Sequence, residues 1–292
     1  MILSVLPGSK KFFYAFYISM NIAPITLNSF TYKKQPAPKF TAYNANVYND
    51  GKLAYRNETE LLRQDLCWDD FMDFVDKKYG DAKEVNVVNH ACSAGYEPWS
   101  LLMMLMKTQG ENYKNFMPIQ ARDLDKNAIE FAQKGALEIC GNEYTDAQTK
   151  FKKIFKKNFK IKKIPKGEGI KISNEYLMTC NTDLKKNIEF KQSDIFDDKD
   201  LINKENTILF CRNFWPYLEG KKASELAFFL AQNMKPSSTI VIGAYDTGYN
   251  VNKLLEKTGF KKTNVKYVYE TPGMPATDQP VDFNMHRFEL YV

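Results

Sequence analysis

The pattern of apolar and polar residues along this chain changes at about residue 57. Residues 57–80 (NETELLRQDLCWDDFMDFVDKKYG) place apolar side chains at helical spacings, with acidic and basic residues between them. This spacing predicts an amphipathic helix or a pair of helices, capped by Asn57 or Thr59. Residues 1–50 are rich in Asn, Tyr and Pro and show no period. They predict a flexible N-terminal arm.

Short runs rich in β-branched residues then alternate with helical patterns. The runs that predict strands are 84–89, 117–121, 188–191, 207–210 and 239–243. The helical patterns between them are 98–107, 126–134 and 219–234. This order is typical of an α/β fold with a parallel, doubly wound sheet.

The end of the chain and an interruption in its middle add to this sheet. A helix is predicted at 251–258, followed by strands at 264–269 and 286–292. Because no helical pattern separates these two strands, they predict an antiparallel hairpin at the sheet edge. The irregular, Lys-rich residues 137–187 predict a small subdomain inserted into a domain that spans 51–292.

Positive charge is concentrated in this insertion. The chain has 41 Lys and Arg against 35 Asp and Glu, and much of the excess of +6 lies between Lys150 and Lys171. Residues 150–163 (KFKKIFKKNFKIKK) place Phe151, Ile154, Phe155 and Phe159 on one helical stripe among lysines. The stripe predicts either a solvated helix packed on the main domain or a docking site for an acidic protein or an anionic lipid surface. No nucleic acid partner is expected, because the aromatic residues belong to the apolar stripe.

The cysteine and histidine content argues against metal and disulfide chemistry. The five cysteines are odd in number and scattered, and the chain has only two histidines. We therefore expect no metal site and no disulfide framework, and the thiols fit a cytoplasmic protein. No apolar run approaches the roughly 18 to 20 residues that a membrane span needs.

Ligands of open α/β sheets bind at the carboxyl ends of the strands, so the loops after the strands are the candidate site. The loop 91–98 (ACSAGYEP) has small residues that allow a cofactor to approach the backbone, and it lacks the GxGxxG of dinucleotide oxidoreductases. After the next strand, an acid in 121–125 (ARDLD) is placed to bind a ribose diol, although Asp125 is equally suited to cap the following helix. Residues 192–196 (QSDIF) offer a polar acceptor beside apolar faces, which suits adenine, or form an ordinary solvated turn.

Five sequence blocks over residues 57–245 together resemble one family. The blocks are NETELLR, VNHACSAGYEPWSLLMML, ARDLDKNAIEFAQKG, IEFKQSDIF and ILFCRNFWPYL. In this order they are similar to motifs of the CheR-type chemotaxis receptor (protein-glutamate) O-methyltransferases. The resemblance implies a Rossmann-like class I methyltransferase fold, with a mostly parallel seven-stranded sheet and an antiparallel C-terminal edge strand. It also implies S-adenosyl-L-methionine as the cofactor.

The resemblance also implies the roles of particular residues. The resemblance implies that the cofactor contacts are Asn57, Thr59, Arg63, Gly95, Glu97, Asp123, Asp194, Ile195, Arg212 and Asn213. Asp194 and Ile195 would flank adenine. Arg63 and Tyr217 would be catalytic, Arg63 by orienting the substrate carboxylate and Tyr217 by a hydrogen bond to the attacking oxygen or the methyl donor. From the residues alone, Arg63 could equally be a surface arginine paired with a nearby Asp, and Tyr217 a half-buried core ring.

Departures from the family pattern leave other functions open. They are Leu61 and Leu62 in place of an aromatic pair, Gln64 in place of an acid, Tyr96 in place of a glutamate, and 244–246 (AYD) in place of His-Ser-Glu. The family's N-terminal helical domain is expected to be mostly absent. We expect a monomer that methylates an acidic protein, such as the cytoplasmic part of a membrane receptor. The alternatives are a different carboxylate acceptor or a non-catalytic S-adenosylmethionine-binding sensor, and a nicotinamide oxidoreductase is disfavoured for want of the glycine motif.

Overall fold

The computed structural model describes residues 46–47, 53–54, 59–165, 173–218 and 221–272. Predictions for Asn57, for most of the arm at 1–50 and for the strand at 286–292 therefore lie outside the described residues. Two short strands, β1 (Asn46–Val47) and β2 (Leu53–Ala54), pair with each other in antiparallel fashion.

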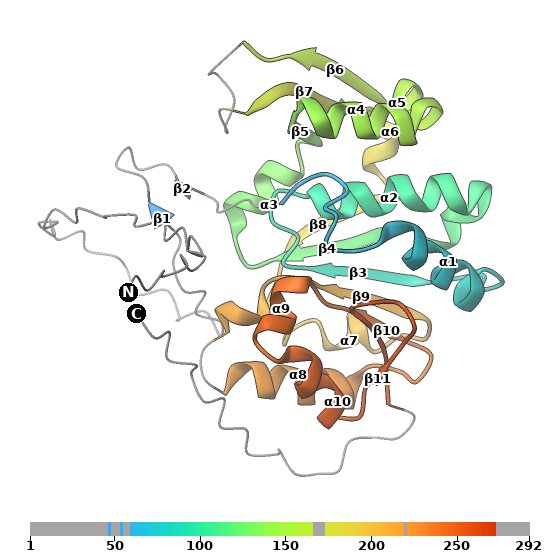
Figure 1. The fold of residues 1–292 in the computed structure, drawn as a ribbon, viewed down its shortest axis with the longest axis vertical. Helices are drawn as coiled ribbons and strands as arrows, with labels where there is room; N and C mark the ends of the chain where they lie inside the picture. The colour runs from blue at the N-terminus through green and yellow to red at the C-terminus, as the bar shows by residue number, and fades with distance from the viewer. Residues whose placement is uncertain (1–45, 48–52, 55–58, 166–172, 219–220, 273–292) are drawn as a thin grey trace, which may run out of the picture. The chain divides into compact units, whose positions relative to one another are not determined.

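A seven-stranded sheet forms the centre of the fold, in the order β11-β12-β10-β9-β3-β4-β8 (Figure 1). Its strands are β3 (Asn86–His90), β4 (Ile119–Asp123), β8 (Ile188–Gln192), β9 (Thr207–Cys211), β10 (Thr239–Val241), β11 (Lys261–Lys262) and β12 (Val268–Glu270). The five strands from β10 to β8 are parallel, and β12 pairs antiparallel with β10 and β11. The predicted mostly parallel, seven-stranded α/β sheet is thus confirmed.

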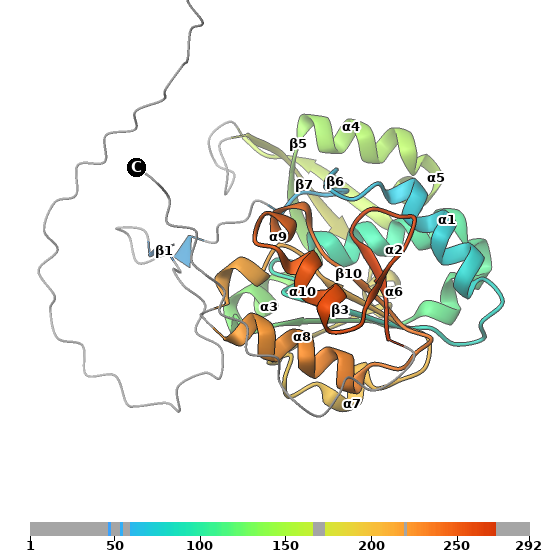
Figure 2. The same ribbon diagram turned by 60° about the horizontal axis from the view of Figure 1, so that its bottom comes forward.

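Helices cover both faces of this sheet (Figures 1 and 2). They are α1 (Trp68–Tyr79), α2 (Tyr96–Thr108), α3 (Lys126–Ala132), α7 (Lys199–Ile202), α8 (Lys222–Asn233), α9 (Ala244–Gly248) and α10 (Val251–Lys257), with the 3-10 helices η1 (Gly110–Phe116) and η2 (Trp215–Tyr217). Val87 and Phe210 belong to the core under α1 and α2, whereas Val88 and Leu209 belong to the core under α8 and α10. This alternation is expected of strands that are buried on both faces.

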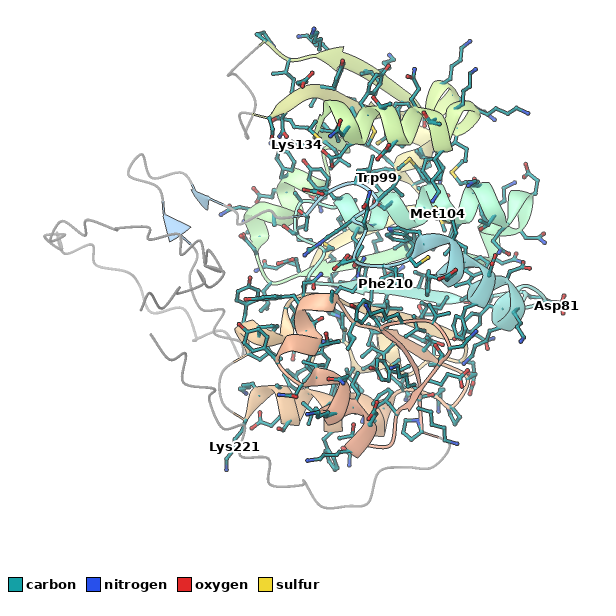
Figure 3. The ribbon with its side chains drawn as sticks, viewed as in Figure 1. Asp81, Trp99, Met104, Lys134, Phe210 and Lys221 are labelled. Carbon is teal, nitrogen blue, oxygen red and sulfur yellow. The ribbon has the colours of Figure 1, made fainter. Side chains whose placement is uncertain are left out.

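The cores are filled by large side chains, as Figure 3 illustrates. Trp99, Met104 and Phe210 lie in the interior, whereas Asp81 and Lys221 project at the periphery. Among the described residues, no helix is long and apolar enough to cross a membrane.

The predicted helix at 57–80 is wrong in its first part. The helix begins only at Trp68, and residues 59–67 form an irregular segment, which we call the strap. Leu61 is nevertheless buried, and Leu62 packs against the same core with φ of 58°. The apolar spacing therefore reflects burial of an irregular segment of turns rather than of a helix, and the N-cap of α1 is Cys67 rather than Asn57 or Thr59.

The region predicted as irregular between 137 and 187 contains a second sheet. The strands β5 (Ala136–Cys140), β6 (Phe159–Lys163) and β7 (Asn174–Cys180) pair in the order β5-β7-β6, and both pairings are antiparallel. The same region contains the helices α4 (Gly141–Lys150), α5 (Lys152–Asn158) and α6 (Thr182–Lys185). The division of the chain into an arm, a domain and an inserted subdomain remains a prediction.

The basic amphipathic helix is shorter than its sequence pattern indicates. α5 ends at Asn158, and Phe159 opens strand β6 instead of continuing the helix. Phe151, Phe155 and Phe159 are all buried, and the ring of Phe159 lies 6.1 Å from that of Trp99 in α2. Packing of the stripe on the main domain is thus what the structure shows.

Candidate functional site

A cavity opens at the carboxyl ends of β3 and β9, where the order of the parallel strands reverses. The chain proceeds from β3 to β4 and β8 on one side and then returns to β9 on the other side of β3. The space measures about 380 Å³ with its open mouth included. Its lining comprises Thr59, Glu60, Arg63, Trp68, Ala91, Cys92, Glu97, Ser100, Arg212 and Asn213. This is the position at which open α/β sheets bind ligands.

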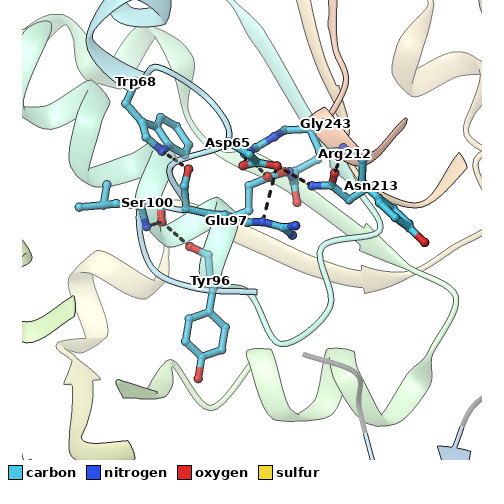
Figure 4. Close-up of polar contacts among 12 residues, drawn as sticks. Asp65, Trp68, Tyr96, Glu97, Ser100, Arg212, Asn213 and Gly243 are labelled. Carbon is cyan, nitrogen blue, oxygen red and sulfur yellow. Dashed lines mark hydrogen bonds and ion pairs between the residues drawn. The ribbon is translucent and has the colours of Figure 1, made fainter. Parts of the chain in front are cut away.

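Arg212 is the centre of the polar network in this cavity (Figure 4). Its Nη1 donates to Glu97 and its Nη2 donates to Asp65, and the guanidinium is almost completely buried. Glu97 also accepts a hydrogen bond of 2.5 Å from the side chain of Asn89. A buried guanidinium is stable only when its charge is paired in this way. The guanidinium also lies over the ring of Trp68, at 5.8 Å from its centroid.

Asp65 is a member of this network that the sequence reasoning missed. Besides Arg212, it accepts a hydrogen bond of 3.0 Å from Asn213 Nδ2, and its Oδ2 lies 3.5 Å from Arg63 Nε. Its side chain is only 15% exposed. The one available signal was that an acid stands two positions after Arg63, next to the departure at Gln64. The proposed pairing of Arg63 with a nearby Asp is present, although Arg63 lies on the strap and lines the cavity.

The strap is held in place by hydrogen bonds to distant parts of the chain. The backbone N–H of Leu61 donates to Glu143 at 2.7 Å, and that of Leu62 donates to Ser100 Oγ at 2.8 Å. Closer in the sequence, the indole of Trp68, the first residue of α1, donates to the carbonyl of Arg63 at 3.1 Å. These bonds satisfy backbone groups that have no helix to bond them.

The loop after β3 has an unusual backbone that its neighbours fix. Ala91, Ser93 and Gly95 have φ of 58°, 48° and 90°. Only glycine suits position 95, because a Cβ there would lie 3.1 Å from the ring of Phe190. Asp123 Oδ2 accepts the Ser93 N–H at 2.7 Å. Gly95 therefore shapes the loop and is not part of the cavity lining.

Asp123, at the end of β4, and Asp125, just after it, make different contacts in the structure. Asp123 binds backbone N–H groups of two loops, since its Oδ1 accepts from Asp125 at 2.9 Å. Burial raises the pKa of Asp123, against the effect of these bonds. Asp125 accepts from Asn127 N at 2.8 Å and is the N-cap of α3. The helix-cap interpretation of Asp125 is thus confirmed.

Asp194 and Ile195 follow β8 and are both buried. Asp194 Oδ1 accepts a hydrogen bond of 3.0 Å from Phe196 N. Its Oδ2 is buried and has no hydrogen-bond partner within the described ranges. An unsatisfied buried carboxylate oxygen is rare in native structures and is consistent with an acceptor that awaits a ligand.

Asn213 connects the cavity to the segment after β10. Its backbone N–H donates to Asp246 Oδ2 at 2.7 Å, and its Oδ1 accepts from Tyr245 N at 3.2 Å. Gly243 N–H donates to the same Asp246 oxygen at 2.7 Å. A Cβ at Gly243 would overlap the Asn213 amide, so glycine is required there.

Three tyrosines form an exposed cluster beside this connection. Tyr217 is 38% exposed, Tyr245 47% and Tyr249 45%. The rings of Tyr217 and Tyr245 lie 6.5 Å apart, and the hydroxyls of Tyr245 and Tyr249 lie 3.1 Å apart. Tyr217 is therefore neither a core ring nor a residue of the cavity lining.

The structure brings five of the ten predicted site residues that it describes into one cavity. Those that line it are Thr59, Arg63, Glu97, Arg212 and Asn213. Those that lie outside its lining are Gly95, Asp123, Asp194, Ile195 and Tyr217, and Asn57 lies outside the described residues. Cavity residues that the sequence reasoning missed are Glu60, Trp68 and Ser100, whereas Ala91 and Cys92 belong to the loop 91–98 that was predicted to approach a cofactor.

Comparison with known proteins identifies the chain's relatives. A chemotaxis protein methyltransferase of Borreliella burgdorferi is 28% identical over 177 residues, which cover 59% of this chain and 56% of that protein. A chemotaxis protein methyltransferase of Vibrio parahaemolyticus is 20% identical over 191 residues, which cover 64% of this chain and 62% of that protein. The chain thus spans less than two thirds of the length of these two relatives.

A family model matches a larger share of the chain. It is described as the CheR methyltransferase, SAM binding domain, and it matches residues 57–263, or 207 of the 292 residues. The match includes the strap, the loops after β3, β4 and β8, and the segment after β9. S-adenosyl-L-methionine is accordingly the cofactor of this domain. The chain belongs to the CheR methyltransferase family.

Proposed function

We propose that this protein transfers a methyl group from S-adenosyl-L-methionine to a carboxylate of an acidic protein, forming a methyl ester. The observation that carries the proposal is the cavity at the reversal point of the sheet, in which Thr59, Glu97 and Arg212 are gathered. Glutamate is the acceptor that the family resemblance implies. A chemoreceptor-like protein in the cytoplasm is the substrate that agrees best with the names of the relatives.

The residues present fit an adenosyl amino acid. Thr59 Oγ1 lines the cavity, and together with Arg212 Nε it is buried without a hydrogen-bond partner among the described residues. Arg63 offers a cation for a ligand carboxylate, and Glu97 offers an anion for a ligand ammonium group. Asp194, with its unsatisfied oxygen, is the group we assign to the adenine amino group.

The chemistry requires little proton transfer from the protein. When bound, the cofactor supplies an electrophilic methyl group on a sulfonium. A glutamate carboxylate is already ionised near pH 7, so no general base has to activate it. We assign Arg63 to orienting the acceptor carboxylate and Tyr217 to a hydrogen bond that fixes the attacking oxygen. Alignment and exclusion of water then contribute most of the rate enhancement.

The residues that depart from the family pattern are not themselves part of the cavity lining. Leu61 and Leu62 pack in the core, and the Tyr96 hydroxyl donates to the carbonyl of Glu138 in β5 at 2.7 Å. Gln64 also lies outside the lining. These substitutions therefore alter the support of the pocket rather than its surface, which favours an enzyme over a non-catalytic sensor.

Positive charge on α5 and β6 supports an acidic protein partner. Seven lysines of α5 and β6 are exposed: Lys152, Lys153, Lys156, Lys157, Lys160, Lys162 and Lys163. No carboxylate of the described residues forms an ion pair with any of them. Such a surface attracts acidic partners and steers their approach.

Methylation with radiolabelled S-adenosylmethionine tests the proposal. The acceptor is a purified cytoplasmic fragment of a chemoreceptor from the same genome, and esters are recognised because alkali releases their label as volatile methanol. We expect labelling by the wild-type protein and a large loss of rate for Arg63→Ala and Tyr217→Phe. Lys199→Ala, on the exposed surface of α7, is the control and should retain full activity. If the wild-type protein binds the cofactor but labels no acidic protein, the proposed activity is wrong.

A further inference from the structure

We infer that Asp65 is a positioning residue whose negative charge balances Arg63 and Arg212 and so tunes the pocket for the cationic sulfonium of the cofactor. The inference rests on the proposed function only for the identity of the cofactor, and it does not depend on the acceptor.

The geometry places Asp65 between three groups of the candidate site. One oxygen accepts from Arg212 Nη2, and the other accepts from Asn213 Nδ2 at 3.0 Å and lies 3.5 Å from Arg63 Nε. Asp65 comes from the strap, whereas its partners Arg212 and Asn213 follow β9, 147 and 148 residues later. One carboxylate therefore joins the two walls of the cavity.

The charges of the network explain why an anion is needed there. Arg63 and Arg212 contribute two positive charges. Glu97 pairs with Arg212, whereas Glu60, the other acid of the lining, is exposed to solvent. Asp65 supplies a negative charge at a site where both it and Arg212 are shielded from water, with side-chain exposures of 15% for Asp65 and 1% for Arg212. Without Asp65, the two guanidinium groups would have only Glu97 as a shielded counter-charge, and the excess positive charge repels a cation.

The two forms of the cofactor differ in the charge that this argument concerns. S-adenosylmethionine carries a sulfonium, whereas S-adenosylhomocysteine, the product of transfer, lacks the transferred methyl group and has a neutral thioether; the remainder of the two molecules is the same. Loss of the Asp65 charge should therefore weaken binding of S-adenosylmethionine selectively. Loss of pocket shape alone would weaken binding of both compounds alike.

Calorimetric titration of Asp65→Asn with each compound tests the inference without any turnover. Asp65→Asn keeps the size of the side chain and removes its charge. If Asp65→Asn does not fold, Asp65→Ser is titrated instead. A unit charge within a poorly hydrated site changes the affinity of an ion roughly tenfold. We expect the dissociation constant of S-adenosylmethionine to rise about tenfold relative to that of S-adenosylhomocysteine.

Two further variants make the outcome unambiguous. Asp69→Asn removes an acid that pairs with Lys150 at 3.1 Å on the exposed side of α1, and it should change neither dissociation constant. Asp65→Glu retains the charge and should retain the wild-type ratio of the two constants, even if both rise. Equal weakening of both compounds by Asp65→Asn, or no weakening, would overturn the inference while the cofactor assignment stands. A wild-type protein that binds neither compound would overturn both.

Discussion

Asp246 provides a test of how burial and hydrogen bonding are balanced beside the candidate site. Its carboxylate accepts the backbone N–H groups of Gly243 and Asn213 at 2.7 Å each. Burial raises the pKa of Asp246 from 3.8 to about 7. Three influences lower this pKa, namely these two hydrogen bonds, a third from the backbone of Trp215 and the nearby charge of Arg212, but desolvation outweighs them. Its Oδ1 is buried without a hydrogen-bond partner in the described part of the chain.

The raised pKa fixes the sign of the pH dependence. Between pH 3.8 and about 7, the folded protein holds a proton on Asp246 that the unfolded chain releases. The folded state is therefore destabilised as the pH rises through this window, by about 1.4 kcal/mol per pH unit. Over the two units from pH 5 to pH 7, the free energy of unfolding should fall by about 2 kcal/mol on account of this group, because the slope flattens as the pH approaches the folded-state pKa.

Urea unfolding of the wild-type protein and Asp246→Asn at pH 5, 6, 7 and 8 measures this effect. The amide of Asn cannot titrate, and the cost of its unsatisfied N–H groups, about 1 to 3 kcal/mol, is independent of pH. Contributions of all other titrating groups cancel in the difference between the two proteins. We expect the stability advantage of the wild type to shrink by about 2 kcal/mol between pH 5 and pH 7. A difference that stays constant over this range would show that the hydrogen bonds, not desolvation, determine the pKa.

Two further predictions concern the segment after β10. Gly243→Ala should displace the Asn213 amide, lower the free energy of unfolding by about 1 to 3 kcal/mol and weaken S-adenosylhomocysteine binding, as urea unfolding and calorimetry can measure. Gly248→Ala, where a Cβ meets nothing within 4 Å, is the matched control, and equal effects of the two would contradict the steric argument. Tyr249→Ala should raise KM for the protein acceptor about two- to tenfold without changing cofactor affinity, because its exposed ring packs on Tyr245, which packs on Tyr217, and is placed to contact the acceptor. Tyr249→Phe keeps the ring and should resemble the wild type, and an unchanged KM in Tyr249→Ala would exclude this contact.

The inner strands β3, β9 and β10 could be predicted from the sequence because they are buried on both faces, whereas the exposed edge strand β11 was missed. The prediction at 207–210 differs by one residue from β9, all of whose residues are buried. The prediction at 57–80 failed for its first part because the strap has its hydrogen-bond partners far away in the sequence. Glu143 lies 82 residues from Leu61, and no local pattern reveals such a contact. Amphipathic spacing indicates burial, and it does not by itself distinguish a helix from an irregular segment.

The basic insertion shows a different ambiguity. Phe151, Phe155 and Phe159 recur every four residues, a spacing that suits one face of a helix and equally one face of a strand. The structure uses both, with Phe155 in α5 and Phe159 in β6. A period-two pattern in 159–163 (FKIKK) was the available signal for the strand.

Residues of the candidate site were predicted where a family motif contained them, and missed where only tertiary structure unites them. Arg212 and Glu97 belong to motifs, and the structure pairs them. Asp65 belongs to no motif, and its partners are separated from it by most of the chain. Cys92 and Ser100 lie within a motif, but the sequence does not tell which members of a helix or loop face the cavity.

The contacts around Arg212 and Asn213 suggest why this pocket is built from charges rather than from apolar packing. Asp65 of the strap and Glu97 of α2 bind Arg212, and Asp65 also binds the side chain of Asn213. Asp246, from the segment after β10, binds the backbone N–H of Asn213. An apolar wall would hold these segments equally well, but it would offer no compensation to a ligand that carries a sulfonium, an ammonium and a carboxylate. Paired acids and bases hold the segments and also present both signs of charge to the ligand. The groups that we propose to bind the cofactor are thus the same groups that hold the pocket together, so we expect stability and affinity to be coupled at this site.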